Sequence, residues 1–167
     1  HLVNNFDQKK FNKAANLIME AENIYIAGHG SSHYIAGLSA FLLQRVGHRA
    51  FHLNNSNLSF IEQLVNIRKD DLLIEFSFPP YFSNTTMAAE FAKKQKAGVI
   101  SITNSVVAPV TKHSSVSLIV KTENQILTNS MTPIIVLLYT LIDEVAVKDK
   151  ERSKNTIRKL ISTREEN

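Results

Sequence analysis

Short apolar runs alternate with longer helical patterns along the chain. The runs are rich in branched residues, which favours strands, and they occupy residues 24–27, 50–53, 72–76, 99–103 and 116–120. The spacing of apolar positions predicts helices before residue 22, at 32–46, 58–67 and 85–97, as a short turn at 107–113, and after residue 130. Apolar strands joined by helical crossovers form a parallel sheet covered on both faces. The pattern therefore predicts an α/β fold, a three-layer αβα sandwich around a five-stranded parallel sheet.

The pattern after residue 130 predicts a helix over 131–147, which contains "PIIVLLYTLIDEVAV". This segment is apolar on almost every side until Asp143, whereas a surface helix of a monomer shows one apolar stripe. Such a helix either packs deep within the domain or contributes to a subunit interface. In both cases it belongs to the scaffold.

Composition narrows the classes of function. The chain of 167 residues fits one domain, and the absence of Cys excludes disulfides, cysteine zinc sites and thiol nucleophiles. The longest apolar run, 133–142, is far shorter than the ~20 residues that span a bilayer, so we expect a cytoplasmic protein with no membrane contact. Much of the excess behind the net charge of +4 lies in "KDKERSKNTIRK", where interleaved acids favour a solvated helix face over a nucleic-acid patch.

The stretch "IYIAGHGSSHYIAG", residues 24–37, runs from the first strand into the next helix. In open parallel sheets, ligands bind beyond the carboxyl ends of the strands where strand order reverses. Gly28 and Gly30 permit a tight turn, Ser31 and Ser32 supply hydroxyl donors, and the start of the helix favours an anion such as phosphate. The alternative is that Ser31 or Ser32 is simply the N-cap of the helix.

Other ligands fit this first loop less well. His33 occupies the third glycine position of a dinucleotide motif, and Asn54 stands where a ribose-binding acid is expected. The phosphate-loop motif and the G-x-S-x-G motif are both missing from the sequence. The pairs His29 with His33 and His48 with His52 straddle element boundaries and lack a zinc-protease pattern, so we expect no metal site. The two histidines of the first loop, His29 and His33, are expected to be incidental to phosphate binding.

A second polar loop follows the third strand. It reads "SFPPYFSNTT", residues 77–86, and its two prolines favour an extended path. Four polar side chains reach the start of the next helix: Ser83, Asn84, Thr85 and Thr86. We expect one of them to cap the helix, and the surplus can bind the same phosphate from a second side. An ordinary capped loop is the alternative.

These segments together resemble a known family. "IYIAGHGSSHYIAG", "DLLIEFSFPPYFSNTTMAAEFAKKQKAGVISIT" and "LIDEV" are similar to the SIS (sugar isomerase) domain of RpiR/MurR-type bacterial transcriptional regulators. The likeness covers nearly the whole chain. It implies a flavodoxin-like sandwich, a homodimer, and a phosphosugar held by serines and threonines of the two loops, without a cofactor. In such regulators a separate N-terminal helix-turn-helix region binds DNA.

The family pattern is G-x-G-x-S, then a strand followed by Ser-Phe-Pro-Arg-Tyr-Ser-x-x-Thr. By position, the resemblance assigns ligand binding to Ser31, Ser32, Ser77 and Thr85. Pro80 replaces the arginine of the pattern and Phe82 replaces its second serine, a loss that Ser83 can offset from the next position. The expected ligand-binding residues are Gly30, Ser31, Ser32, Ser77, Ser83, Thr85 and Thr86.

An isomerase of sugar phosphates would need a base at the same edge of the sheet. The candidates are Glu62, Glu75, Glu123 and His29, of which Glu123 and His29 stand beyond the ends of strands. An isolated acid after a strand is more often a loop residue than a base, so we expect no catalytic residue.

The sequence therefore predicts an effector and dimerisation domain of an RpiR-type regulator, which binds a hexose, hexosamine or muramic-acid 6-phosphate. Residues 1–22 are expected to form a linker helix from the DNA-binding region, residues 23–150 the SIS domain, and residues 151–167 a C-terminal helix or tail. The alternatives are a stand-alone sugar-phosphate isomerase and a dimerisation module with a degenerate pocket.

Overall fold

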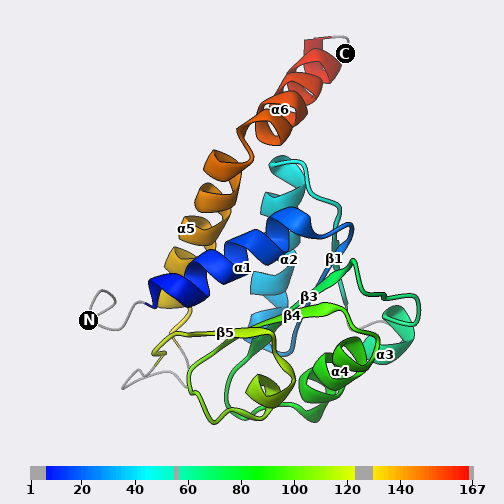
Figure 1. Cartoon of the computed structure of the whole chain (residues 1–167), viewed down its shortest axis with the longest axis vertical. Coiled ribbons are helices and arrows are strands. Elements are labelled where there is room, and N and C mark those ends of the chain that lie inside the picture. The colour runs from blue at the N-terminus through cyan, green and yellow to red at the C-terminus, as the bar shows by residue number, and fades with distance from the viewer. Residues whose placement is uncertain (1–6, 55–56, 123–129, 166–167) are drawn as a thin grey trace.

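The computed structural model describes residues 7–54, 57–122 and 130–165 (Figure 1). Five strands form one sheet: β1 (Ile24–Gly28), β2 (Ala50–His52), β3 (Leu72–Ser77), β4 (Gly98–Thr103) and β5 (Val116–Ile119). All neighbouring strands are parallel, and their order across the sheet is β2-β1-β3-β4-β5. The predicted five-stranded parallel sheet is confirmed.

Helices cover both faces of this sheet. They are α1 (Gln8–Glu20), α2 (Ser31–Arg45), α3 (Phe60–Gln63), α4 (Ser83–Lys94), the 3-10 helix η1 (Pro109–His113), α5 (Thr132–Lys148) and α6 (Lys150–Glu165). Helices α1, α2 and α5 pack on one face, whereas α3, α4 and η1 pack on the other. The three layers of the predicted αβα sandwich are therefore present.

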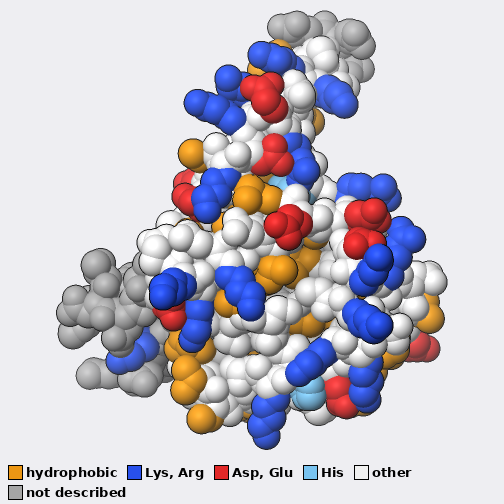
Figure 2. All heavy atoms as spheres, viewed as in Figure 1, with side chains coloured by type: hydrophobic (Ala, Val, Ile, Leu, Met, Phe, Trp, Pro, Cys, Tyr) orange, Lys and Arg blue, Asp and Glu red, His pale blue; other side chains and the backbone are white. Residues whose placement is uncertain are grey.

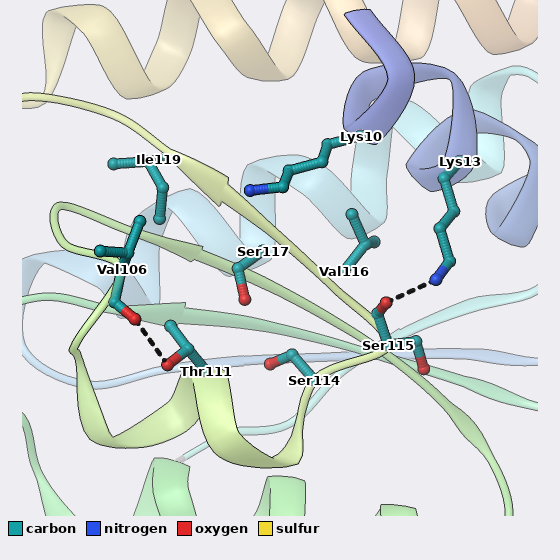
Figure 3. A pocket seen from close by; sticks show the side chains of 9 residues that line it. All are labelled: Lys10, Lys13, Val106, Thr111, Ser114, Ser115, Val116, Ser117 and Ile119. Carbon is teal, nitrogen blue, oxygen red and sulfur yellow. Dashed lines mark hydrogen bonds between the residues drawn. The ribbon is translucent and has the colours of Figure 1, made fainter. Parts of the chain in front are cut away.

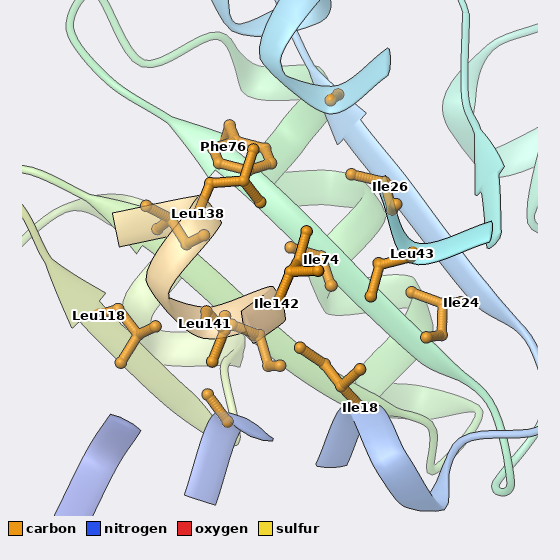
Figure 4. Packing of buried hydrophobic residues seen from close by; sticks show 14 of the residues in the cluster. Ile18, Ile24, Ile26, Leu43, Ile74, Phe76, Leu118, Leu138, Leu141 and Ile142 are labelled. Carbon is orange, nitrogen blue, oxygen red and sulfur yellow. The ribbon is translucent and has the colours of Figure 1, made fainter. Parts of the chain in front are cut away.

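The core explains why the strands are apolar at successive positions. All six residues of β3 are buried, because alternate side chains point into the two helical layers. Ile74 and Phe76 belong to the cluster under α1, α2 and α5, which Figure 4 shows around Leu138 and Ile142 of α5. Leu73 belongs to the second cluster, under α3 and α4.

The helix predicted over 58–67 is wrong in length, since α3 ends at Gln63. Beyond it the chain continues in tight turns, in which the backbone N–H of Ile67 donates to the carbonyl of Leu64 at 2.8 Å. Leu64 and Ile67 are buried together with Phe60. Consecutive turns thus satisfied the apolar spacing that resembled a longer helix.

Helix α5 buries one face and leaves part of another apolar face exposed. Ile134, Leu138 and Leu141 are in the core, whereas Val136 and Tyr139 are 47% and 46% exposed. Helix α6 continues from α5 and projects from the body of the domain (Figure 1). Figure 2 shows basic side chains interspersed with acidic ones along this projection, as a solvated helix face requires.

The base of α6 is fixed to the body by Arg152. Its guanidinium lies 2.9 Å from Nδ1 of the buried His48 and 3.1 Å from the carboxylate of Asp149. Burial, and then the charge of Arg152, lowers the pKa of His48 to about 4, so the imidazole is neutral at physiological pH.

Within the described ranges, no helix combines the length and apolar character that crossing a bilayer requires.

Candidate functional site

The two polar loops meet where strand order reverses. From β1 the chain goes through α2 to β2 on one side, and β3 then lies on the other side of β1. Gly28 at the end of β1 pairs in register with Phe76 of β3, so the loops that start α2 and α4 leave neighbouring strands at the same edge. This is the place where open parallel sheets bind ligands.

Two glycines give the first loop its path. A Cβ on Gly28 would lie 2.5 Å from the backbone oxygen of Ser32, so glycine lets the start of α2 approach β1 closely. Gly30 has φ of 58° and is the N-cap residue of α2, a backbone conformation that favours glycine. The loop therefore brings the first turn of α2 directly over the end of β1.

The two helices that start here have no side-chain cap. The structure describes all the residues of both first turns. The N-cap residues are Gly30 in α2 and Phe82 in α4, and neither helix has a side-chain cap. The prediction that one of Ser83, Asn84, Thr85 and Thr86 caps α4 is therefore wrong, and so is the alternative that Ser31 or Ser32 is an N-cap. The N–H groups of Ser32, His33 and Thr85 donate to backbone carbonyls within their own turns, and those of Ser31, Ser83 and Asn84 are left for a ligand.

The predicted hydroxyl residues fall into two groups. Ser32, Ser77 and Thr85 are buried, and the Oγ of Ser77 lies 3.4 Å from the Oγ1 of Thr85. Thr85 also donates to the carbonyl oxygen of Phe82 at 2.7 Å, which holds the loop against the first turn of α4. Ser31 and Ser83 are exposed at the two helix starts.

Thr86 is half-buried in the first turn of α4. Across the described residues, the hydroxyls of Ser31, Ser32, Ser83 and Thr86 make no hydrogen bond. Each of these hydroxyls therefore still has its proton available to donate to a ligand. The structure joins Ser77 directly to Thr85, and it places the other predicted residues on the two helix starts around them.

The second loop, which departs from the family pattern at Pro80 and Phe82, turns sharply between β3 and α4. Pro79 and Pro80 are joined by a cis peptide bond, and Tyr81 has φ of 51°. The Tyr81 hydroxyl donates to Oδ1 of Asn104 at 2.6 Å, which ties this loop to the segment after β4. Phe82 is 45% exposed, so an apolar ring stands where the pattern has a serine.

His29 joins the two loops, a role that the sequence did not predict. Its Nε2 lies 3.3 Å from Nδ2 of Asn84, and its ring lies 4.9 Å from the ring of Phe82 and 5.1 Å from that of Phe60. Burial, and then the neighbouring His33, lowers the pKa of His29. The position of His29 beyond the end of β1 was the available signal, but partners from another loop cannot be read from the sequence.

The two acidic candidates that the structure describes, Glu62 and Glu75, lie away from this arrangement. Glu62 forms a capping box with Ser59, whose hydrogen bonds lower the pKa of its carboxyl. Glu75 is fully buried in β3, and burial raises its pKa well above the ordinary value. Glu123 lies outside the described residues. Of the three candidates in the described part of the chain, His29 is the one that the structure brings into the site.

The histidines do not pair as their spacing in the sequence would require. The rings of His33 and His52 lie 4.4 Å apart, whereas His48 faces Arg152. Over the ranges that the structure describes, no three or more His, Asp or Glu side chains gather in a way that could hold a metal ion. The site offers hydroxyls, backbone N–H groups and one imidazole, which suit a neutral polyol with an anionic group.

A model of the SIS domain matches residues 17–143. The chain belongs to the SIS domain family. This SIS domain is 22% identical over 166 residues to an uncharacterized HTH-type transcriptional regulator of Haemophilus influenzae, a match that covers 93% of this chain and 57% of that protein. It is 30% identical over 104 residues to glutamine–fructose-6-phosphate aminotransferase (isomerizing) of Pyrobaculum aerophilum, covering 62% of this chain and 17% of the enzyme.

Solved structures share the fold. The sugar isomerase domain of the RpiR transcription factor from Sphaerobacter thermophilus superposes with a TM-score of 0.91 at 24% identity, covering 96% of this chain and 90% of that chain. The NanR protein of Vibrio vulnificus, solved in complex with ManNAc-6P, has a TM-score of 0.84 at 20% identity, covering 97% and 62%. The SIS domain expected from the two loops is confirmed.

Proposed function

We propose that this SIS domain is the phosphosugar-binding effector domain of an RpiR-type transcriptional regulator. The observation that carries the proposal is the pair of helix starts at the switch point, α2 and α4, which lack side-chain caps and retain unspent hydroxyls. The ligand-binding residues are proposed to be Gly30, Ser31, Ser32, Ser77, Ser83, Thr85 and Thr86.

On this proposal, the starts of α2 and α4 bind the phosphate, and the side chains between the two loops bind the sugar. The phosphate would accept hydrogen bonds from the free first-turn N–H groups and from the Ser32 hydroxyl, because the positive dipole ends favour an anion. Thr85, whose proton goes to the Phe82 carbonyl, would hold the loop around the phosphate and offer its oxygen to the ligand. His29 and Asn84 would face the sugar, since they already lie side by side between the loops. Phe82 would cover an apolar face of the sugar ring, in place of the serine of the family pattern.

The relatives support a regulatory role. One is named as an HTH-type transcriptional regulator, and NanR was solved with a sugar phosphate. On this proposal, residues 1–22 contain a linker helix from a DNA-binding region, residues 23–150 form the SIS domain and residues 151–167 form a C-terminal helix. A regulator of this kind works on DNA in the bacterial cytoplasm.

A thermal-shift screen tests the proposal. The chain is incubated with hexose, hexosamine and muramic-acid 6-phosphates, with each parent sugar and with inorganic phosphate as controls. We expect at least one 6-phosphate to raise the melting temperature more than its parent sugar and phosphate do together. A screen in which no 6-phosphate stabilises the chain would leave a dimerisation module with a degenerate pocket as the better description.

A sugar-phosphate isomerase is the second candidate, and His29 is the observation that favours it. The ring stands in the site, and burial keeps it neutral and able to accept a proton. We propose that the domain binds its ligand without converting it, because the two described carboxylates among the candidates are a helix cap and a buried strand residue. Aldose-ketose conversion of a stabilising ligand, followed by ³¹P NMR, would contradict this.

We also propose that the chain forms a homodimer through the exposed apolar face of α5. Val136 and Tyr139 lie on it, and Phe41 of α2 is 54% exposed. Replacement of Val136 by Asp is expected to shift the sedimentation coefficient from dimer to monomer, since it would bury a charge at an apolar contact. Val107, 82% exposed near η1, is the matched control, and Val107→Asp should leave the dimer intact.

A further inference from the structure

A pocket of about 370 Å³ lies at the open edge of the sheet, beside β5 (Figure 3). Its walls come from α1, from η1 with the segment that precedes it, and from β5 itself. The switch point lies between β1 and β3, and β4 separates β3 from β5. The pocket is therefore distinct from the proposed phosphosugar site.

Two lysines of α1 reach into this pocket from above, as Figure 3 shows. The Nζ of Lys13 donates to the carbonyl oxygen of Ser115 at 2.7 Å, which holds the ammonium beside β5 with two further donors left. The Nζ of Lys10 lies 3.7 Å from the Asp7 carboxylate, and both side chains are about half-exposed. Such a pair is weak, so Lys10 keeps its positive charge available.

Two of the four hydroxyls in the lining keep a proton to donate, whereas Thr111 and Ser114 donate theirs to backbone carbonyls of the η1 segment. Ser117 Oγ accepts a hydrogen bond from Ser101 at 2.7 Å, and Ser115 Oγ accepts one from the Val99 backbone at 3.0 Å. Each serine thus has its own proton left to donate. Among the described residues that line the pocket, none carries a carboxylate. The polar part of the pocket therefore matches an anion.

The rest of the lining is apolar. Val106, Val116 and Ile119 contribute aliphatic surface next to the lysines and serines. The volume is near the lower end of the range for small-molecule sites. A compact ligand that joins one anionic group to one apolar group fits both parts.

We propose that this pocket binds a small organic anion, a phosphate monoester or a carboxylate that carries a compact apolar group. Its anionic group contacts Lys10, Lys13 and Ser117, and its apolar group lies against Val106 and Ile119. Because α1 supplies both lysines and packs on α5 and β5, the bound ligand also fastens α1 to the edge of the sheet.

An NMR titration of the ¹⁵N-labelled chain tests this second site. The probes are phenyl phosphate, phenylacetate and the neutral benzyl alcohol, and the reporters are the amides of Ser115, Ser117 and Lys13. We expect saturable shifts with at least one of the two anions at millimolar concentration. Comparison of the two anions identifies whether phosphate or carboxylate is preferred.

The double variant Lys10→Gln/Lys13→Gln is expected to weaken binding at least tenfold, whereas Lys69→Gln/Lys159→Gln, at exposed positions elsewhere, should bind as the wild type does. If the double variant fails to fold, Lys10→Gln alone is expected to weaken binding several-fold. The proposal is overturned if no anion gives saturable shifts, if benzyl alcohol binds equally well, or if the lysine variants bind with wild-type affinity.

Discussion

Two pairs of helix starts in this domain differ in whether a polar side chain caps the helix. Helix α1 is capped by the Asp7 carboxylate, which accepts from the Lys10 backbone, and α3 begins with the capping box of Ser59 and Glu62. Helices α2 and α4 have serines and threonines in their first turns, yet their N-caps are Gly30 and Phe82. The pairs differ in place, since α2 and α4 begin at the switch point of the sheet.

The difference separates polar residues that stabilise the fold from polar residues that are free to bind. A side-chain cap satisfies backbone N–H groups at the expense of ligand binding. Helix α5 also lacks a side-chain cap, but Pro133 in its first turn has no N–H group to satisfy. Uncapped starts with surplus hydroxyls are therefore the feature that marks α2 and α4 within the described chain.

The largest expected effect comes from Gly28→Ala. The new Cβ would lie 2.5 Å from a backbone oxygen of Ser32, so the start of α2 must move away from β1. We expect a loss of about 3 kcal/mol in the free energy of unfolding together with loss of sugar-phosphate affinity. Gly98→Ala is the control, because its Cβ meets the flexible Leu72 side chain at 3.2 Å and should cost less. Urea unfolding of both variants checks this, and equal losses would contradict the close approach.

Ser32→Ala and Thr85→Val test the uncapped pair directly. Ser32→Ala removes a hydroxyl that we assign to the phosphate, so affinity should fall by about 1–3 kcal/mol while stability changes little. Thr85→Val also removes the hydrogen bond to the Phe82 carbonyl, so it should lower both affinity and stability. The matched controls are Ser162→Ala in α6 and Thr140→Val in α5, whose hydroxyls donate to backbone carbonyls of their own helices. Calorimetric titration with the ligand found in the screen measures the affinities. Unchanged affinity in Ser32→Ala would make the first loop structural.

Glu75 is a further polar side chain without a partner, and it lies in β3 beneath the second loop. Within the described residues neither of its carboxyl oxygens has a partner, and burial raises its pKa well above the ordinary value of 4.5. The folded state thus keeps a proton that the unfolded chain releases. Stability should be greatest below pH 4.5 and fall by up to about 1.4 kcal/mol per pH unit as pH rises to the folded pKa.

Glu75→Gln is expected to remove this slope, whereas Glu151→Gln, at an exposed position, should retain it. Urea unfolding between pH 5 and 8 measures the slope for all three chains. A wild-type stability that rises with pH over this range, and that no longer rises in Glu75→Gln, would contradict this prediction. It would mean that the Glu75 carboxylate is paired in the folded state.

The smallest effect is expected at the capped pair. Asp7→Ala and Ser59→Ala each remove a cap, so each should lower the free energy of unfolding by about 1 kcal/mol and leave sugar-phosphate affinity unchanged. Asp7→Asn, which keeps a capping oxygen, should retain most of the stability. A cap variant that loses affinity but not stability would erase the distinction between the two pairs.

The sheet was predictable from sequence because its strands are apolar at successive positions and the runs are separated by helical patterns. The order of the two polar loops along the chain also predicted the family. The length of α3 was not predictable, since turns and helices share the spacing of Phe60, Leu64 and Ile67.

Details of the site depended on contacts between distant segments. Caps at α2 and α4 were expected from residue type, but backbone geometry makes Gly30 and Phe82 the N-cap residues. The link between His29 and Asn84 spans 55 positions, and that between Tyr81 and Asn104 spans 23. Residue type alone cannot fix such pairs, because they follow from how the loops after β1, β3 and β4 fold over one edge.

An amide NMR titration with the stabilising sugar 6-phosphate tests most directly whether the ligand binds at the starts of α2 and α4. We predict saturable shifts at the first turns of both α2 and α4, from Gly30 to Ser32 and from Ser83 to Thr85, and unshifted amides at the start of α1, which lies away from the switch point. Shifts confined to the capped helices, or a ligand that binds without moving the amides of α2 and α4, would contradict the assignment of the site.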